Sequence, residues 1–146
     1  MPPEDRRVPT VSTILPEYDL VLSKVIGTLT ERDLVQRAYA TRDDPRFHPN
    51  LRQLLDLRDI EVAPEIDGSI IRRLATLKWY APDAKRAMVA TDDIVFGLAR
   101  MYQMLREESH SGIHVFRSMD EALAYLDLTA ARSTILDILA GWAGEG

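Results

Sequence analysis

The stretch Arg52-Gln53-Leu54-Leu55-Asp56-Leu57-Arg58-Asp59-Ile60 carries four aliphatic side chains within a polar neighbourhood. A short apolar run of this kind is typical of a strand that is buried on both faces. Because side chains alternate across a strand, Leu55 and Leu57 are expected on one face, and Leu54 and Ile60 on the other. We therefore expect this strand to lie inside a sheet, with apolar layers above and below it.

The segments around this strand alternate between strand and helix patterns. Two β-rich runs, 11–15 and 20–26, are separated by the turn-forming group 16–19, which predicts an antiparallel hairpin that ends at Gly27. Helical periodicity or helix-start signals then predict helices at about 30–42, 66–81, 92–108, 118–126 and 131–142, and short apolar runs predict strands at 86–90 and 113–116. This order favours an α/β fold with a mainly parallel sheet, right-handed crossovers and one antiparallel edge strand.

Helix starts are marked by capping residues. Thr30 and Asp92 precede helical periodicity with acids in the first turn, and Ser118 stands three residues before Glu121, the spacing of a capping box. Gly68 is costly inside a helix, so either the helix begins near Asp67 or a close backbone contact favours glycine there.

The composition is that of one soluble globular domain. The chain has 146 residues, of which 46 % are hydrophobic and 28 % charged, and no uncharged apolar run is long enough to cross a bilayer. The first residues mix acids with bases and lack an apolar stretch, so a secretory signal is not expected. We expect a cytoplasmic protein with no integral membrane association.

Several classes of chemistry are excluded or disfavoured. The chain has no cysteine, which excludes disulfides, thiolate metal sites and thiol catalysis. Its net charge of −5 argues against nucleic acid as a partner. No phosphate-binding glycine loop or nucleophile elbow occurs.

The remaining candidates for chemistry are weak. His110 and His114 are four residues apart, but Gly112 between them breaks the helix that a metal site would need. Asp56 and Asp59 could act as paired carboxylates, although aspartates at strand ends more often fix the following loop. We therefore expect no enzyme, no catalytic residue, no metal and no cofactor.

Three separated motifs resemble a known family. They are Asp44-Pro45-Arg46-Phe47-His48-Pro49-Asn50-Leu51-Arg52-Gln53-Leu54-Leu55-Asp56-Leu57-Arg58, Phe96-Gly97-Leu98-Ala99-Arg100-Met101-Tyr102 and Val115-Phe116-Arg117-Ser118-Met119-Asp120-Glu121-Ala122-Leu123-Ala124-Tyr125-Leu126. The sequence resembles the SpoIIAA-like family of small bacterial proteins, which belongs with the STAS (anti-sigma-factor antagonist) and Sec14-type lipid-binding folds. The resemblance covers residues 11–127, after a flexible lead-in at 1–10 and before a C-terminal helical extension at 128–146.

The resemblance implies a β/α superhelix and does not imply an enzyme. STAS antagonists are switched by phosphorylation of a serine at the start of the helix that follows the strand matching residues 52–60. The nearest serine here is Ser69, which makes it a candidate phosphosite. The local pattern Asp67-Gly68-Ser69 departs from the family motif, so an ordinary helix-start serine is the competing interpretation.

Two binding roles remain open. In the first, the domain associates with another protein or with a second copy of itself as a homodimer. The candidate surface is either Phe96, Met101 and Met104, which lie off the core stripe of their helix, or the seam of the last helix with Ile138 and Trp142. In the alternative, it carries an apolar, lipid-like small molecule, with Trp79 and Tyr80 at the mouth of a cavity. Ala131, Ile135, Ile138 and Trp142 form a narrow seam on the last helix, which could pack on its own domain or on a second chain.

Overall fold

The structure is a computed structural model that describes residues 10–62, 66–107 and 112–143. The sheet is formed by β1 (Thr10–Leu15), β2 (Leu20–Leu29), β3 (Arg52–Val62), β4 (Arg86–Val89) and β5 (Ile113–Phe116). The helices are α1 (Glu31–Asp43), α2 (Gly68–Leu74), α3 (Asp93–Arg106), α4 (Met119–Tyr125) and α5 (Arg132–Ala143), with short 3-10 turns at Pro16–Tyr18 and Thr129–Ala131. Residues 1–9 of the expected lead-in lie outside the described residues, and Thr10 already belongs to β1.

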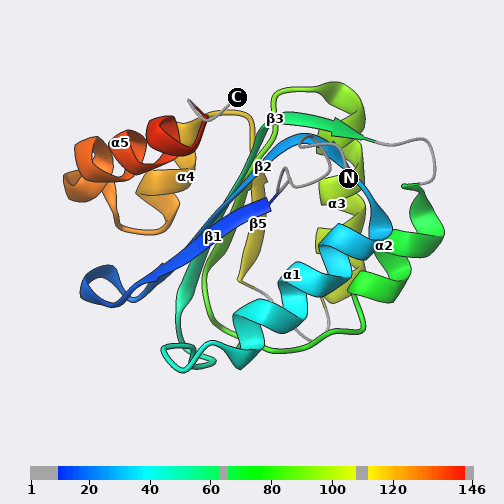
Figure 1. Ribbon diagram of the computed structural model, residues 1–146, viewed down its shortest axis with the longest axis horizontal. Coiled ribbons are helices and arrows are strands. Elements are labelled where there is room, and N and C mark those ends of the chain that lie inside the picture. The colour runs from blue at the N-terminus through cyan, green and yellow to red at the C-terminus, as the bar shows by residue number, and fades with distance from the viewer. Residues whose placement is uncertain (1–9, 63–65, 108–111, 144–146) are drawn as a thin grey trace, which may run out of the picture.

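The described strands form one sheet in the order β1-β2-β3-β4-β5. β1 and β2 pair antiparallel, and the other neighbours pair parallel. β3 is therefore the central strand, which confirms the interior position predicted for residues 52–60 (Figure 1). The α/β class and the antiparallel edge strand are confirmed as well.

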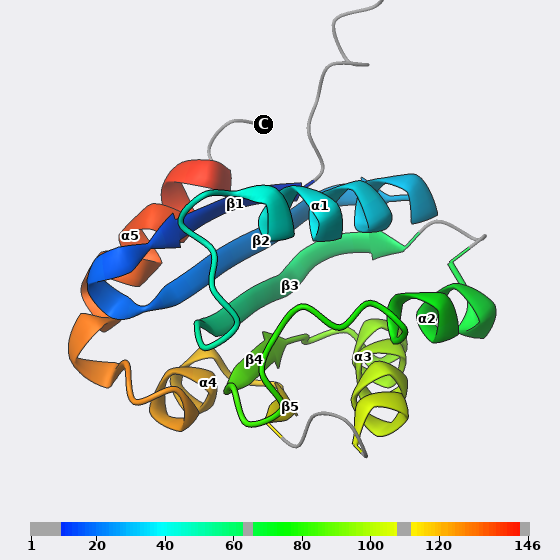
Figure 2. The same cartoon turned by 90° about the horizontal axis from the view of Figure 1, so that it is seen from below.

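This strand order explains why the helices form two layers. When each crossover is right-handed and leads to the next strand along, every crossover helix lies on the same face of the sheet. α1, α2 and α3 share that face, and α4 and α5 cover the other (Figure 1). On the first face, α1 lies on the side of β1 and β2, whereas α2 and α3 lie on the side of β4 and β5 (Figure 2).

The C-terminal helix packs on its own domain. Ile135 and Leu139 of α5 are buried in one cluster with Leu22 and Leu54 of the sheet, and this cluster also includes α4. Without α4 and α5 that face of the sheet would be exposed, because all the crossovers lie on the opposite side. The seam on the last helix thus covers the second face of the sheet.

A bulge between β2 and β3 changes one expectation about the central strand. Lys24 pairs with Asp56, but Ile26 pairs with Asp59, so β3 has one residue more than β2 between these pairs. The extra residue brings Ile60 to the same face as Leu55 and Leu57. The prediction that Ile60 lies on the face of Leu54 was therefore wrong, because a bulge shifts the alternation of side chains.

Two element boundaries also differ from the predictions. Gly27 does not end β2, because it takes a φ of +76° inside the strand, which continues to Leu29. α2 ends at Leu74 rather than near Pro82, so the connection to β4 is a long irregular segment that includes Trp79 and Tyr80.

The predicted helix caps are present. Thr30 and Asp33 form a reciprocal capping box on α1, and the carboxylate of Asp92 accepts from two backbone N–H groups of α3. Asp67 caps α2 in the same way, so Gly68 is its first residue. A Cβ atom at Gly68 would lie 3.0 Å from Met101 Cε, the flexible end of a side chain and not backbone, so only the first explanation for this glycine is confirmed.

Candidate functional site

A cavity of about 190 Å³ lies between the sheet and the three helices on its first face. Side chains from β2, β3 and β4 form its floor, α1, α2 and α3 form its walls, and Trp79 and Tyr80 close one side. Most of the lining is apolar. The central apolar residues are Val25, Leu34, Leu55, Leu57, Ile60, Ile71, Leu74, Met88, Val95, Leu98 and Ala99.

The cavity exists because α1 stands away from the sheet. The described helix has no buried residue along its 13 positions, although Leu34 and Ala38 face the cavity. Leu55 lies on the central strand, where a side chain is normally fully covered, and it is only half-buried. α1 and the α2–α3 pair lie toward opposite edges of the sheet (Figure 2), and residues of all three helices line the cavity.

Several polar atoms around this apolar space are buried without a hydrogen-bond partner in the described structure. They are Thr10 Oγ1, Arg37 Nε, Trp79 Nε1 and Tyr80 OH, and all four residues line the cavity. Buried polar groups in folded proteins are almost always hydrogen-bonded, so unpartnered ones need an explanation. Their gathering around one cavity makes that cavity the candidate binding site.

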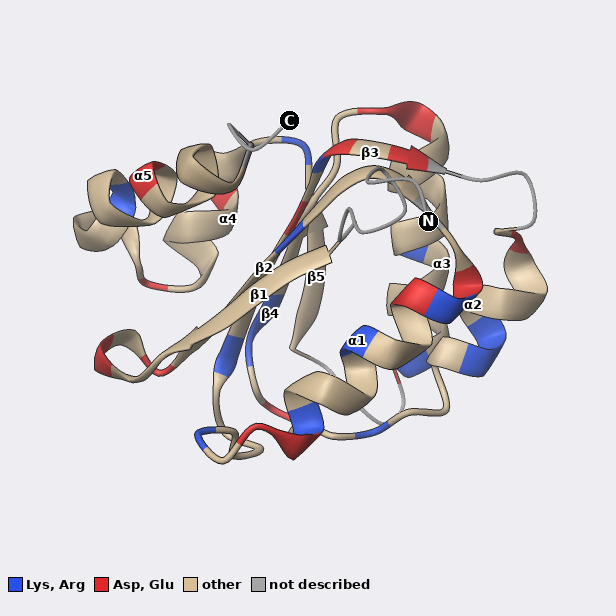
Figure 3. Cartoon of the chain, in the orientation of Figure 1, with Lys and Arg blue, Asp and Glu red and all other residues tan. Residues whose placement is uncertain are grey.

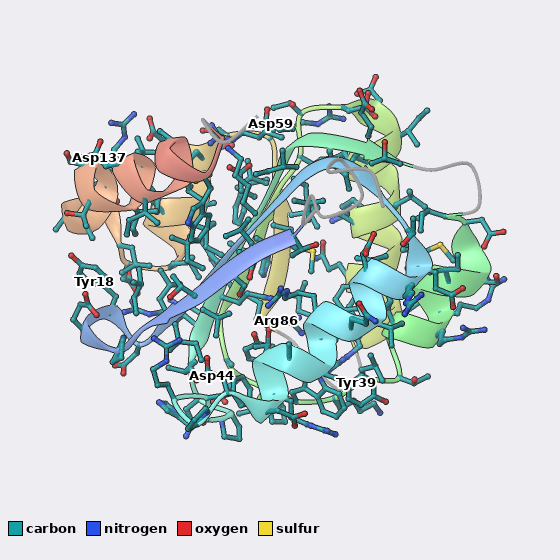
Figure 4. The ribbon with its side chains drawn as sticks, viewed as in Figure 1. Tyr18, Tyr39, Asp44, Asp59, Arg86 and Asp137 are labelled. Carbon is teal, nitrogen blue, oxygen red and sulfur yellow. The ribbon has the colours of Figure 1, made fainter. Side chains whose placement is uncertain are left out.

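Arg86 is the buried cation of the site, with only 7 % of its surface exposed. Its Nε donates to Gln53 Oε1 at 2.8 Å and its Nη1 to the Tyr102 hydroxyl at 3.2 Å. Its guanidinium also lies 4.2 Å from the centre of the Tyr80 ring. None of the described residues that line the cavity is Asp or Glu. Figure 4 shows Arg86 between the sheet and α1.

Tyr80 is held in its neutral form by its surroundings. Burial raises the pKa of its phenol to about 12, and the positive charge of Arg86 opposes that rise only in part. The ring packs edge-on against Phe47 at a centroid distance of 5.3 Å. At neutral pH the hydroxyl can therefore donate a hydrogen bond into the cavity.

Trp79 and Tyr80, the candidate ligand mouth, both line the cavity. Their role as a mouth stays a prediction. Trp79 is half-buried and lies against Tyr39, with Arg42 4.9 Å from its ring centre. The sequence analysis missed Arg37 and Arg86. An arginine at the start of an otherwise apolar strand was the available signal for Arg86.

The two candidate interfaces lie on opposite sides of the sheet. Ile138 and Trp142 are partly buried against the core beneath α5, whereas Phe96, Met101 and Met104 lie on α3, on the other side of the sheet. Within the second group, Arg117 covers the Phe96 ring at 4.1 Å, and 56 % of Met104 is exposed. Whether any of them meets a partner stays a prediction.

Ser69, the candidate phosphosite, is exposed at the second position of α2. Its hydroxyl donates to Asp67 Oδ1 at 2.8 Å, and the same carboxylate caps the helix. This hydroxyl also holds the pKa of Asp67 below its usual value. Phosphorylation of Ser69 would place two negative groups side by side, so the structure offers no support for it beyond exposure.

The two aspartates of β3 serve a buried ion network. Lys24 Nζ lies 3.0 Å from Asp59 Oδ2 and 3.8 Å from Asp56 Oδ2, and Arg58 Nε donates to Asp56 Oδ1 at 2.9 Å. The Asp56 side chain is fully buried beside α5. The paired carboxylates are thus neutralised by cations of the chain itself, which favours their structural interpretation over acid-base work.

Metal and membrane sites are not evident in the part of the chain that the structure describes. No group of three metal-ligating side chains occurs among residues 10–62, 66–107 and 112–143, and His110 lies outside these ranges. None of the helices in these ranges has the length and apolar character needed to span a bilayer. Acidic and basic residues lie beside one another on α1 and on α5 (Figure 3).

No protein-family model matches the chain, and no curated protein matches it in sequence. In three dimensions the chain is similar to an uncharacterised protein of the DUF3478 family from Shewanella loihica PV-4, whose crystal structure is described as a SpoIIAA-like fold. The TM-score is 0.55, the sequences are 15 % identical, and the similarity covers 80 % of this chain and 93 % of that chain. The chain therefore has the SpoIIAA-like fold that its motifs suggested, and at this identity the similarity shows the fold alone.

Proposed function

We propose that this protein binds a small, largely apolar molecule in the cavity beneath α1 and that it catalyses no reaction. The cavity is the observation that carries the proposal. It joins an apolar lining from three helices and three strands with buried polar atoms that lack partners in the described structure. Concave apolar sites with a few converging polar groups are the usual form of small-molecule sites.

The volume limits the size of the ligand. An engineered apolar cavity of about 150 Å³ holds benzene, and the cavity here is about 190 Å³. A molecule of roughly ten non-hydrogen atoms fits this space. The ligand is accordingly smaller than the lipid-like molecules that the Sec14 kinship suggested.

α1 supplies the route to the site. The helix has no buried residue, and two polar contacts hold it near the cavity: Arg37 Nη2 donates to the Thr10 carbonyl at 3.3 Å, and Arg73 of α2 pairs with Glu31. The Arg73 side chain is 67 % exposed in its pair with Glu31, and exposed ion pairs contribute little free energy. We propose that α1 moves outward to admit the ligand.

A cavity-filling substitution on α1 tests the proposal. The protein is refolded after solvent extraction and titrated with octanamide, a neutral molecule of suitable size, by calorimetry. Wild-type protein is expected to bind, and Ala38→Phe, which projects a ring into the cavity, is expected to lose at least about tenfold in affinity. Ala40→Phe is the matched control, because Ala40 lies on the same helix and is exposed. Equal affinities of the two variants, or no binding by wild-type protein, would contradict the proposal.

Association with a second copy of the chain is the second candidate, supported by apolar exposure on α3. Met104 and Leu105, which are adjacent near the C-terminal end of α3, are 56 % and 43 % exposed, and exposed apolar clusters mark interaction surfaces. Met101 is a poor choice for the test because it packs on Gly68 of α2. If this surface forms a dimer, the double variant Met104→Glu and Leu105→Glu should halve the mass in solution. An unchanged mass would contradict dimer formation through this surface of α3.

A further inference from the structure

We infer that the ligand is an acid: a compact molecule whose apolar body fills the cavity and whose carboxylate is bound by Arg86 and Arg37. This inference rests on the proposed function and names the chemical class of its ligand. It follows from the charges and donors around the cavity, which the apolar lining alone does not explain.

The first argument is the unbalanced charge of Arg86. Its guanidinium is buried, and the hydrogen bonds that it donates go to neutral groups, the amide oxygen of Gln53 and the hydroxyl of Tyr102. A buried charge is costly unless an opposite charge accompanies it. The described residues that line the cavity include Arg37 and Arg86 but no acid.

Lys24, another buried cation of the described chain, shows what a balanced site looks like. Lys24 is as buried as Arg86, and it lies within 4 Å of both Asp56 and Asp59. On that face of the sheet the chain supplies the counter-charge for its cation. On the cavity face the counter-charge is left for the ligand.

The second argument is the number of donors that lack an acceptor. Arg37 Nε, Trp79 Nε1 and Tyr80 OH are buried, line the cavity and have no hydrogen-bond partner in the described structure. A carboxylate accepts up to about four hydrogen bonds and donates none. It therefore suits a site with several donors, and hydrogen bonds to a charged acceptor are stronger than those to a neutral one.

A pair of matched ligands tests the inference. Octanoate and octanamide have the same number of non-hydrogen atoms, and only octanoate carries a charge at neutral pH. Wild-type protein should bind octanoate at least about tenfold more tightly in calorimetric titrations. Arg86→Met should abolish that preference while octanamide binding stays within about threefold of wild type, which shows that the cavity is intact.

Two further variants complete the experiment. Arg37→Gln should also reduce the preference for octanoate, and it decides the test if Arg86→Met does not fold, because Arg37 is only half-buried. Arg132→Gln is the control, since this arginine is exposed on α5 on the other face of the sheet. Its affinities should equal those of wild type.

The possible outcomes distinguish a failure of this inference from a failure of the proposed function. Equal affinities for octanoate and octanamide would contradict the inference that the ligand is an acid, while the cavity would still be a binding site. A preference for octanoate that survives both Arg86→Met and Arg37→Gln would overturn the assignment to these arginines. If wild-type protein binds neither molecule, the proposed function is contradicted as well.

Discussion

Tyr80 is the residue whose chemistry depends most on the cavity. Its phenol is buried with a pKa of about 12, whereas a tyrosine in an unfolded chain has a pKa of about 10. Below pH 10 the phenol is neutral in both states and adds no pH dependence. Between about pH 10 and 12 the unfolded chain loses this proton and the folded chain keeps it, so the free energy of unfolding falls as pH rises.

The substitution Tyr80→Phe removes this contribution. In wild-type protein, the ionisation of Tyr80 in the unfolded chain should lower the free energy of unfolding by about 1.4 kcal/mol per pH unit above pH 10. Urea unfolding at about pH 8 and about pH 11 should therefore show a smaller loss in Tyr80→Phe than in wild type. Tyr39→Phe, at an exposed tyrosine, is the control. The same loss in all three proteins would mean that Tyr80 is not buried in solution.

The ion network on the other face gives a second prediction for single residues. Asp56 and Asp59 both pair with Lys24, but the Asp56 side chain is 0 % exposed and the Asp59 side chain 54 %. Asp56→Ala removes this partner from the buried Lys24 and should cost about 3 kcal/mol of unfolding free energy. Asp59→Ala should cost less than about 1 kcal/mol. Chemical denaturation measures both, and similar costs would contradict the assigned burial.

At the scale of elements, α5 covers the face of the sheet that the crossovers leave open. Ile135 and Leu139 are 0 % and 1 % exposed against the sheet, so Ile135→Ala should cost about 2–5 kcal/mol of unfolding free energy. Asp137→Ala, an exposed position on the same helix, should be close to neutral. A neutral effect of Ile135→Ala would show that α5 does not pack on its own domain in solution.

The sequence was sufficient to identify most elements, because their signals are local. The apolar run of β3, the hairpin of β1 and β2, and the caps at Thr30, Asp92 and Ser118 each depend on a few neighbouring residues. The wrong expectations concern features set by pairing partners. The face of Ile60 depends on a bulge against β2, and Gly27 stays in a strand because that strand is held by its neighbours.

The candidate site was predictable only in part, for the same reason. Trp79 and Tyr80 were proposed as a ligand mouth because two adjacent aromatics stand near a proline, and both line the cavity. The cavity itself depends on how far α1 lies from α2 and α3, which no local pattern encodes. Arg37 and Arg86 come from a helix and a strand far apart in the chain, so their meeting at one cavity appeared only in the structure.

At the scale of the whole molecule, the order of strands accounts for both faces of the domain. Successive crossovers place α1, α2 and α3 on one face, where they line the cavity, and α4 and α5 fill the opposite face. One face is thus a closed core and the other contains a space lined by apolar groups and two arginines. This asymmetry supports a binding role for the cavity face.

The most direct test of ligand binding is native mass spectrometry of the protein purified from its own cells, repeated after denaturation. Wild-type protein should carry one extra small mass per chain that disappears on denaturation, and the organic extract should contain an acid of matching mass. Ala38→Phe should show the bare chain. A bare chain for wild-type protein under native conditions, with nothing in the extract, would contradict the account.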